Sequence, residues 1–330
     1  MQLETPEKVD QQQAIGGHIN RPLLLTPEQD IFGYVFGLVG QGLLLMVTLT
    51  SVVAVLLILA FIVIESVPFI RDHGLIEMLG STQWYPQRNP GAEFGALAII
   101  IGSLYVTLGA LMIAVPIGLL AAVFLSDIVS FRWRQVFKPI IEIMAAIPSV
   151  AYGFFAVLVL APWLQKNLGI STGTNALNAS IMLSIMAIPT IVSIAEDAIS
   201  SVGRDMREGA YSLGASRAET MIKVVIPAGH SGVIAAIILG MMRAIGETMV
   251  VWMASGNAAQ VPSPWWDITQ SIRTMTATIA GEMGETAKNS DHYHSLFAIG
   301  LILLVMTFGM NLASEYFLAR AKRISTGGGK

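Results

Sequence analysis

Long apolar blocks separated by shorter polar segments dominate this chain. Residues 31–64 and 94–126 contain no acidic or basic residue. A helix needs roughly 20 apolar residues to cross about 30 Å of hydrocarbon. Further blocks of suitable length occupy residues 143–165, about 176–195, 224–254 and 295–314. The pattern predicts an all-α polytopic membrane protein with six transmembrane helices.

The polar segments predict how the chain is divided. We expect an N-terminal tail over 1–30, a first span over 31–64, a loop over 65–93, a core of five spans over 94–315 and a C-terminal tail over 316–330. Within the core, two polar loops cover residues 203–223 and 255–294.

Basic residues predict the orientation of the spans, because cytoplasmic loops carry an excess of Lys and Arg. With the N-terminus inside, the external segments hold only a few such residues: Arg71, Arg88, Lys166, Arg273 and Lys288. We therefore expect both termini in the cytoplasm, with the loops 65–93 and 255–294 outside.

Composition narrows the function classes. Only 12% of the residues are charged, against about 25% in soluble domains. No basic patch predicts a nucleic-acid partner, so membrane lipid is the expected surrounding. The chain contains no cysteine, which excludes disulfides, thiolate metal sites and a Cys nucleophile. Asp291, His292 and His294 suggest a metal site, but a solvated loop accounts for them, and we expect no metal site and no catalytic residue.

Prolines and glycines recur inside the apolar blocks. Three prolines remove helical hydrogen bonds: Pro116, Pro148 and Pro189. Several glycines permit close contact between helices, among them Gly109, Gly118 and Gly240. These features fit a bundle around a pathway, and ordinary helix packing explains them about as well.

The polar segment before the fifth block reads EGAYSLGASRAETMIKVVIP from Glu208 to Pro227. Asp205, three residues before Glu208, has the spacing of a capping box at a helix start. A short apolar stripe follows at helical spacing: Met206, Ala210 and Leu213. The pattern predicts a short helix with an apolar stripe along one side.

Gly214 predicts a sharp turn after this helix, because glycine adopts positive φ at little cost. A second short helix is expected from Ala215 to Lys223, with Pro227 near the start of the fifth span, where a missing N–H costs little. A rigid helix-turn-helix of this kind transmits displacement from a partner. An ordinary amphipathic loop is the alternative interpretation.

Arg243 and Glu247 are charged residues within the otherwise apolar fifth block. Their spacing of four predicts one face of a continuous helix. A charge within the membrane normally faces a cavity or a partner. The planar fork of arginine matches two oxygens of an oxyanion, and Glu247 can accept a hydrogen bond from a protonated phosphate oxygen. The alternative is a structural ion pair between helices.

The loop spacing resembles the cytoplasmic coupling loop of permease subunits of ABC importers. That family pattern is Glu-Ala-Ala, three residues, Gly, nine residues, Ile-x-Leu-Pro. The matching positions here are Glu208, Gly209, Ala210, Gly214, Val224, Ile226 and Pro227. The resemblance implies that the loop contacts an ATPase, through Asp205, Glu208, Gly209, Ala210, Leu213 and Gly214.

Two further segments resemble the phosphate-specific (Pst) branch of these permeases. They are MRAIGETM, from Met242 to Met249, and IPSVAYG, from Ile147 to Gly153. The resemblance, over roughly residues 95–315, implies the type I ABC importer permease (MetI-like) core. It also implies a substrate pathway containing Arg243, Glu247 and Thr248, and a location in the bacterial inner membrane.

The resemblance implies a complex of several chains. The expected partners are a homologous second permease subunit (PstA-like), a dimer of ATPase subunits (PstB-like) and an external phosphate-binding protein (PstS-like). The sequence contains no G-x-x-x-x-G-K-[ST] loop for nucleotide phosphates. We therefore expect no cofactor on this chain, with ATP and Mg²⁺ bound by the partner ATPase.

The expected function is a channel-forming, non-catalytic permease subunit that moves phosphate into the cytoplasm by alternating access. A permease for sulfate or molybdate is the nearest alternative. An ion-coupled secondary transporter predicts further intramembrane acids, and only Glu142, near the edge of a block, is a candidate besides Glu247. An assembly or sensory subunit leaves the Arg243 and Glu247 charges unexplained except as structural contacts.

Overall fold

The computed structural model describes residues 31–88 and 90–326. The expected cytoplasmic tail 1–30 and the last four residues of the C-terminal tail lie outside the described residues. The chain divides into two compact units, residues 1–61 and 62–330. Helix α2, from Ile31 to His73, continues past the predicted end of the first span at residue 64 and contains Pro68. The predicted loop 65–93 therefore begins as helix.

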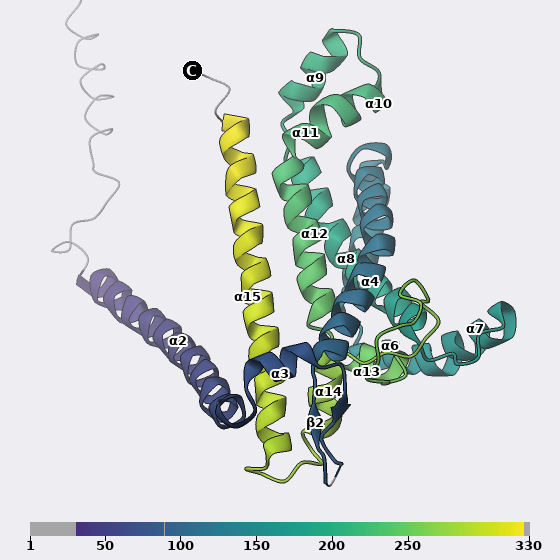
Figure 1. The fold of residues 1–330 in the computed structure, drawn as a ribbon. Coiled ribbons are helices and arrows are strands. Elements are labelled where there is room, and N and C mark those ends of the chain that lie inside the picture. Colours follow the sequence, from purple (N-terminus) through teal and green to yellow (C-terminus); the bar gives the residue numbers. More distant parts are fainter. Residues whose placement is uncertain (1–30, 89, 327–330) are drawn as a thin grey trace, which may run out of the picture. The chain divides into compact units, whose positions relative to one another are not determined.

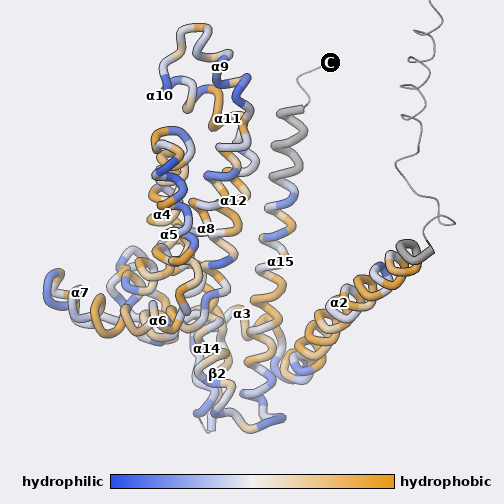
Figure 2. The backbone as a smooth tube through the Cα atoms, turned by 180° about the vertical axis from the view of Figure 1, so that it is seen from behind, coloured by the Kyte–Doolittle hydropathy of each residue, from blue (hydrophilic) through white to orange (hydrophobic). Residues whose placement is uncertain are grey.

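Among the described residues, five helices are long and apolar enough to cross a membrane: Val35–His73, Leu97–Ile128, Ser149–Leu168, Ala176–Ser200 and Asp291–Tyr316. A sixth span results if residues 217–228 and 230–245, which meet at a bend of 73°, are taken together. Figure 2 shows that hydrophobic residues predominate along α2 and in the membrane-length part of α15 (Asp291–Thr326). The prediction of an all-α polytopic membrane protein is confirmed.

Helix α8 (Ala176–Ser200) is the centre of the second unit. It packs most extensively against α4 (Leu97–Val123) and then against α12 (His230–Ile245), and these helices run side by side with it (Figure 1). Most of its membrane-length window is buried by the chain itself. Substitutions in α8 therefore act on packing with two neighbours at once.

Small residues set the spacing between these helices. A Cβ atom at Gly118 would lie 2.8 Å from Cγ2 of Ile191, and one at Gly240 would lie 2.6 Å from its Cγ1. Gly109 similarly leaves no room for a Cβ beside Ser180. The predicted close helix contacts at these three glycines are therefore confirmed.

The third block differs from its prediction of a span over 143–165. Helix α5 (Phe131–Ala146) ends before Pro148, and α6 (Ser149–Phe155) starts after it. Proline lacks an N–H and disfavours helical geometry in the residue before it, and Ile147 is extended. A π-helical turn η2 (Ala156–Leu160) and α7 (Ala161–Leu168) complete the segment. Pro116 and Pro189 lie inside α4 and α8, as expected.

The fifth block is interrupted twice, which corrects the prediction of one continuous span over 224–254. A π-helical turn η3 (Met221–Val225) and α11 (Ile226–Ala228) precede the bend at Gly229. Helix α12 ends at Ile245, and α13 (Met249–Ala254) begins after the break at Gly246–Thr248. Arg243 and Glu247 therefore do not share one face of a continuous helix.

The two ends of the long helices carry different short elements (Figure 1). At one end lie α3 (Leu75–Gly80), α14 (Met275–Glu282) and the antiparallel pair β1 (Trp84–Tyr85) and β2 (Glu93–Phe94). The opposite end carries α9 (Arg204–Ser212) and α10 (Arg217–Thr220), while α4 extends as a π-helical turn η1 (Phe124–Ile128). The predicted external loops and the predicted coupling loop thus lie at opposite ends of the second unit.

Candidate functional site: an arginine at a helix break and the loop at the opposite end

Arg243 lies in the last turn of α12, where the helix dipole favours a cation. Its guanidinium is half-buried and donates two hydrogen bonds to other elements. Nη1 donates to Oγ1 of Thr190 in α8 at 3.2 Å, and Nη2 donates to the main-chain oxygen of Ala145 in α5 at 3.1 Å. The side chain thus joins three helical segments.

The main-chain oxygen of Ala145 is free to accept the second bond because α5 ends at Ala146. The last carbonyls of a helix have no partner within it, and Pro148 has no N–H to offer. The Tyr152 hydroxyl donates to the oxygen of Met144 at 3.0 Å, and Arg243 satisfies that of Ala145. The break in the IPSVAYG segment and the arginine of the MRAIGETM segment therefore form one site.

Glu247 and Thr248 lie in the non-helical break after α12. Among the described side chains, neither Arg243 nor Glu247 forms an ion pair. The alternative interpretation of a structural ion pair between helices is therefore not observed for these two residues in this conformation. The Thr276 hydroxyl donates to the main-chain oxygen of Glu247 at 2.8 Å, which supports the break.

The surroundings of Glu247 are rich in hydroxyl groups. Ser103, Thr107, Thr274 and Thr276 line a cavity beside it of about 10 Å³. That volume matches about one water molecule, so an oxyanion does not fit. The space beside Glu247 is therefore too small for an oxyanion in this conformation.

The α9–α10 loop has the predicted helix-turn-helix form, with a different cap. Helix α9 begins after Gly203 without a side-chain cap, so the capping box predicted at Asp205 and Glu208 is wrong. It lies instead at α10, where Ser216 Oγ accepts from the N–H of Glu219 and the Glu219 carboxylate accepts from the N–H of Ser216. The bonds from the Ser216 backbone and side chain, followed by that from Lys223, hold the pKa of Glu219 below its ordinary value.

The turn at Gly214 confirms the sequence prediction. Its φ is +83°, and its N–H donates to the oxygen of Tyr211 at 2.9 Å. The N–H of Ala215 donates to the oxygen of Ala210 at 3.1 Å, which completes a Schellman motif. Backbone geometry, rather than side-chain packing, therefore fixes the turn.

The loop presents an apolar surface. Leu213 is 90% exposed, and Met206 is half exposed. Both line a cavity of about 480 Å³ together with Ala210, Gly214 and Glu219. Asp205, Glu208 and Gly209 are also exposed. The six predicted contact residues thus belong to one protruding loop, with three of them beside the cavity.

An ion pair connects this loop to the long helices. Arg207 of α9 donates from Nη1 to Oδ1 of Asp127 in η1 at 2.7 Å, and from Nη2 to the oxygen of Ile199 in α8 at 2.9 Å. Arg207 thus attaches α9 to η1 at the end of α4 and to the end of α8.

Sequence reasoning missed a buried carboxylate near that end of α8. Glu196 is 1% exposed and accepts hydrogen bonds from Arg134, Lys138 and Ser200. The hydrogen bond to Asp197 contributes most to raising the pKa of Lys138. A signal was present in the sequence. Two acidic residues, 196 and 197, follow an apolar block, and the segment 132–138 carries basic residues of opposite charge.

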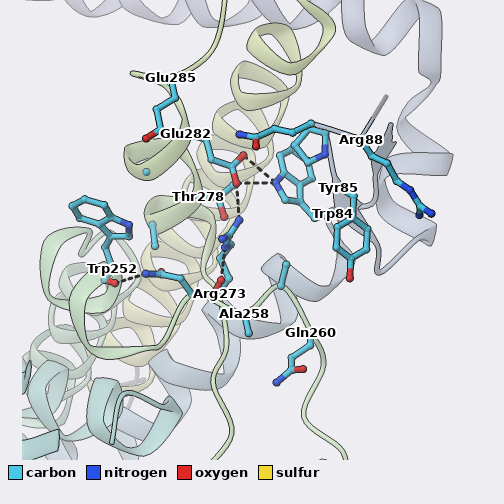
Figure 3. A pocket seen from close by; sticks show the side chains of 16 residues that line it. Trp84, Tyr85, Arg88, Trp252, Ala258, Gln260, Arg273, Thr278, Glu282 and Glu285 are labelled. Atoms are coloured by element: carbon cyan, nitrogen blue, oxygen red, sulfur yellow. Dashed lines mark hydrogen bonds and ion pairs between the residues drawn. The ribbon is translucent and has the colours of Figure 1, made fainter. Parts of the chain in front are cut away.

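The opposite end holds a second cluster of charges (Figure 3). Glu282 accepts from Arg273 Nη1 at 2.6 Å, from Trp84 Nε1 at 3.0 and 3.2 Å, and lies 2.8 Å from His292 Nε2. Trp84, Arg273 and Glu282 border an open cavity of about 850 Å³. In the adjacent loop, hydrogen bonds from Thr269 and then Gln270 lower the pKa of Asp267.

The histidines considered for a metal site have separate partners. His292 contacts Glu282, His294 contacts the main-chain oxygen and carboxylate of Glu65, and Asp291 lies 3.7 Å from His73. No group of three potential ligands that could hold a metal occurs among the residues that the structure describes.

Comparison with known proteins defines the class. Residues 114–323 match the family described as "Binding-protein-dependent transport system inner membrane component". The chain is 38% identical over 247 residues to the probable ABC transporter permease protein YqgH of Bacillus subtilis, covering 75% of this chain and 79% of YqgH. It is 34% identical over 261 residues to the phosphate transport system permease protein PstC of Mesorhizobium japonicum, covering 73% and 78%.

A solved structure supports the fold. An inward-facing MetNI methionine ABC transporter aligns with a TM-score of 0.51 at 15% identity, covering 69% of this chain and 94% of that chain. The chain is a multi-pass inner-membrane permease with the MetI-like core. It belongs to the family of binding-protein-dependent transport system inner membrane components, as the coupling-loop resemblance implied.

Proposed function

We propose that this chain is a channel-forming permease subunit of an ATP-driven phosphate importer. The similarity to PstC over most of the chain supports phosphate as the substrate. The observation that carries the proposal is the position of Arg243, whose guanidinium lies between the end of α5, α8 and the break after α12. An arginine fork there provides paired donors for an oxyanion.

The proposed mechanism is alternating access. Both present contacts of Arg243 are to neutral acceptors, Thr190 and the oxygen of Ala145. An anion can therefore replace them without first breaking an ion pair. Glu247 and Thr248 lie on the adjacent break, and the narrow space there must widen for an oxyanion to pass. A carboxylate at this point can accept a hydrogen bond from the protonated oxygen of hydrogen phosphate, whereas sulfate at neutral pH has no proton to donate.

The proposed partners follow from the family and the loop. We assign six residues of the protruding loop to contact with a dimer of ATPase subunits, which would carry ATP and Mg²⁺: Asp205, Glu208, Gly209, Ala210, Leu213 and Gly214. A homologous second permease subunit would complete the channel, and an external phosphate-binding protein would load it. This chain makes no covalent chemistry, and both of its termini lie in the cytoplasm.

Reconstitution of the assembled complex tests this function. In proteoliposomes with internal ATP and the loaded binding protein, radiolabelled phosphate should accumulate, whereas labelled sulfate and molybdate should not. Accumulation of sulfate or molybdate instead would favour the alternative oxyanion function. Phosphate uptake driven by an ion gradient without ATP would favour a secondary transporter. Mass spectrometry of co-purified chains identifies the partners.

A further inference from the structure

Glu196 is an acidic side chain whose burial requires an explanation. It is 1% exposed, near the end of α8, and its carboxylate accepts from Arg134, from Lys138 Nζ at 3.0 Å and from Ser200 Oγ at 2.8 Å. Buried ion pairs frequently contribute less stability than apolar residues of the same volume, whereas loss of one partner is strongly destabilising. Because stability alone does not explain these ion pairs, we ask which helix they hold in place. We call Arg134, Lys138 and Glu196 the α5 anchor.

The α5 anchor fixes a helix that has little other attachment. None of the residues of α5 is buried, and α8 is its main packing partner. The α5 residues that carry the anchor charges are Arg134 and Lys138, one helical turn apart. Large apolar residues of α5 are exposed, among them Trp133, Phe137 and Ile140. The position of α5 along α8 thus depends on these ion pairs.

The other end of α5 reaches the pathway site. Ala145, whose oxygen binds Arg243, lies eleven residues after Arg134, which corresponds to about 16 Å along a helix. Helix α5 includes both positions, with Pro139 between them. A shift of α5 at the anchor therefore moves the acceptor that holds Arg243.

The coupling loop meets α8 beside the anchor. Arg207 of α9 binds the oxygen of Ile199, three residues after Glu196, and the carboxylate of Asp127. The Ser200 hydroxyl donates to Glu196 at 2.8 Å, and its oxygen lies 3.2 Å from the hydroxyl oxygen of Ser126. The same turn of α8 thus contacts α5, the end of α4 and the coupling helix.

We propose that Glu196 is a positioning residue that connects the coupling helix to the pathway arginine. Displacement of α9 moves the end of α8, the α5 anchor transfers that movement to α5, and α5 places or withdraws the Ala145 oxygen at Arg243. The proposal rests on the proposed transport function and adds a residue remote from both the substrate and the ATPase. It predicts that loss of the anchor separates ATP hydrolysis from transport.

Glu196→Gln tests the proposal in the assembled complex. The substitution keeps the shape of the side chain and removes the charge that holds Arg134 and Lys138. Hydrolysis stimulated by the loaded binding protein should persist, while phosphate moved per ATP should fall by about tenfold, within the range of coupling residues far from both sites. Asp197→Asn is the matched control, because Asp197 is 63% exposed and its loss leaves all hydrogen bonds to Glu196 in place.

The double variant Arg134→Gln with Glu196→Gln separates positioning from simple stabilisation. It removes charge from both sides of the anchor, so the complex should assemble better than the single variant, while the ratio of phosphate to ATP should stay low. Recovery of that ratio in the double variant, or a normal ratio in assembled Glu196→Gln, would overturn the proposal. If the wild-type complex itself moves no phosphate in this assay, the proposed function fails instead.

Discussion

The guanidinium of Arg243 binds the main-chain oxygen of Ala145 at 3.1 Å. The two residues are 98 positions apart, and their contact joins the break before Pro148 to the end of α12. A charged donor thereby occupies a carbonyl that the helix leaves unpaired. This contact supplies a preformed but replaceable resting position for an arginine that we assign to anion binding.

Thr190 should support that resting position. Thr190→Val preserves the shape of the side chain and removes the acceptor of the Arg243 Nη1 bond. We expect uptake at a fixed concentration of loaded binding protein to fall by about ten- to a hundredfold, the effect of losing a hydrogen bond to a charged group. Uptake kinetics at constant complex abundance provide the measurement. Ser184→Ala is the control, since that hydroxyl binds only its own helix at Ile181, and equal effects of both changes would contradict the assignment.

Gly214→Val should damage the coupling turn. The residue has φ of +83°, and no atom lies within 4 Å of the position that a Cβ would occupy. The loss of stability therefore comes from the backbone conformation and amounts to about 1–2 kcal/mol. We expect weaker binding of the ATPase subunit or hydrolysis without uptake, with normal membrane insertion. Gly203→Ala is the matched control at the start of the same loop, where a Cβ also meets open space but φ is −54°, a value that alanine readily adopts. Coupled transport at wild-type levels in Gly214→Val would argue against the coupling role.

Gly240→Ala should disturb the contact between α12 and α8. Its new Cβ would lie 2.6 Å from Cγ1 of Ile191, and overpacking of this kind costs about 1–3 kcal/mol. The thermal midpoint of the purified complex should fall, and Ile191→Ala in the same chain should recover part of the loss. Gly309→Ala in α15, where no neighbour lies within 4 Å, should leave the midpoint unchanged. An unchanged midpoint in Gly240→Ala would show that the helices can separate freely at this point.

Local chemistry made some features predictable. The positive φ at Gly214 follows from a glycine between two short helical patterns, and the close contacts at Gly118 and Gly240 follow from small residues in apolar helices. The capping box was assigned to Asp205 because its spacing to Glu208 fits. Ser216 and Glu219 have the same spacing. The folded structure shows which pair stands at a helix start: Ser216 is the N-cap of α10, whereas Asp205 lies inside α9.

Other features depend on residues far apart in the sequence. The break after Ile245 is supported by the Thr276 hydroxyl, 29 positions away from Glu247. Glycine within an apolar block does not by itself predict such an interruption. The partners of Glu196 lie 58 and 62 positions before it. Helical spacing reports only neighbours within one element, so the α5 anchor was not visible in the sequence.

Cysteine labelling tests the orientation of the second unit. The chain has no native cysteine, and Ser212 and Ser263 are both exposed at positions predicted to lie on opposite sides of the membrane. In intact cells, Ser263→Cys should react with a membrane-impermeant thiol reagent, whereas Ser212→Cys should react only after the membrane is opened. The reverse pattern would contradict the orientation derived from the basic residues.

The most direct test of the account replaces Arg243 and measures ATP-dependent uptake of radiolabelled phosphate by the reconstituted complex, normalised to assembled complex. Arg243→Gln should abolish uptake while the complex still assembles and binds its loaded external partner. Arg243→Lys should restore little, because an ammonium keeps the charge but lacks the planar fork. Glu247→Gln should impair phosphate uptake less. Normal uptake by Arg243→Gln, or a decrease that only follows complex abundance, would contradict a role for Arg243 in the pathway.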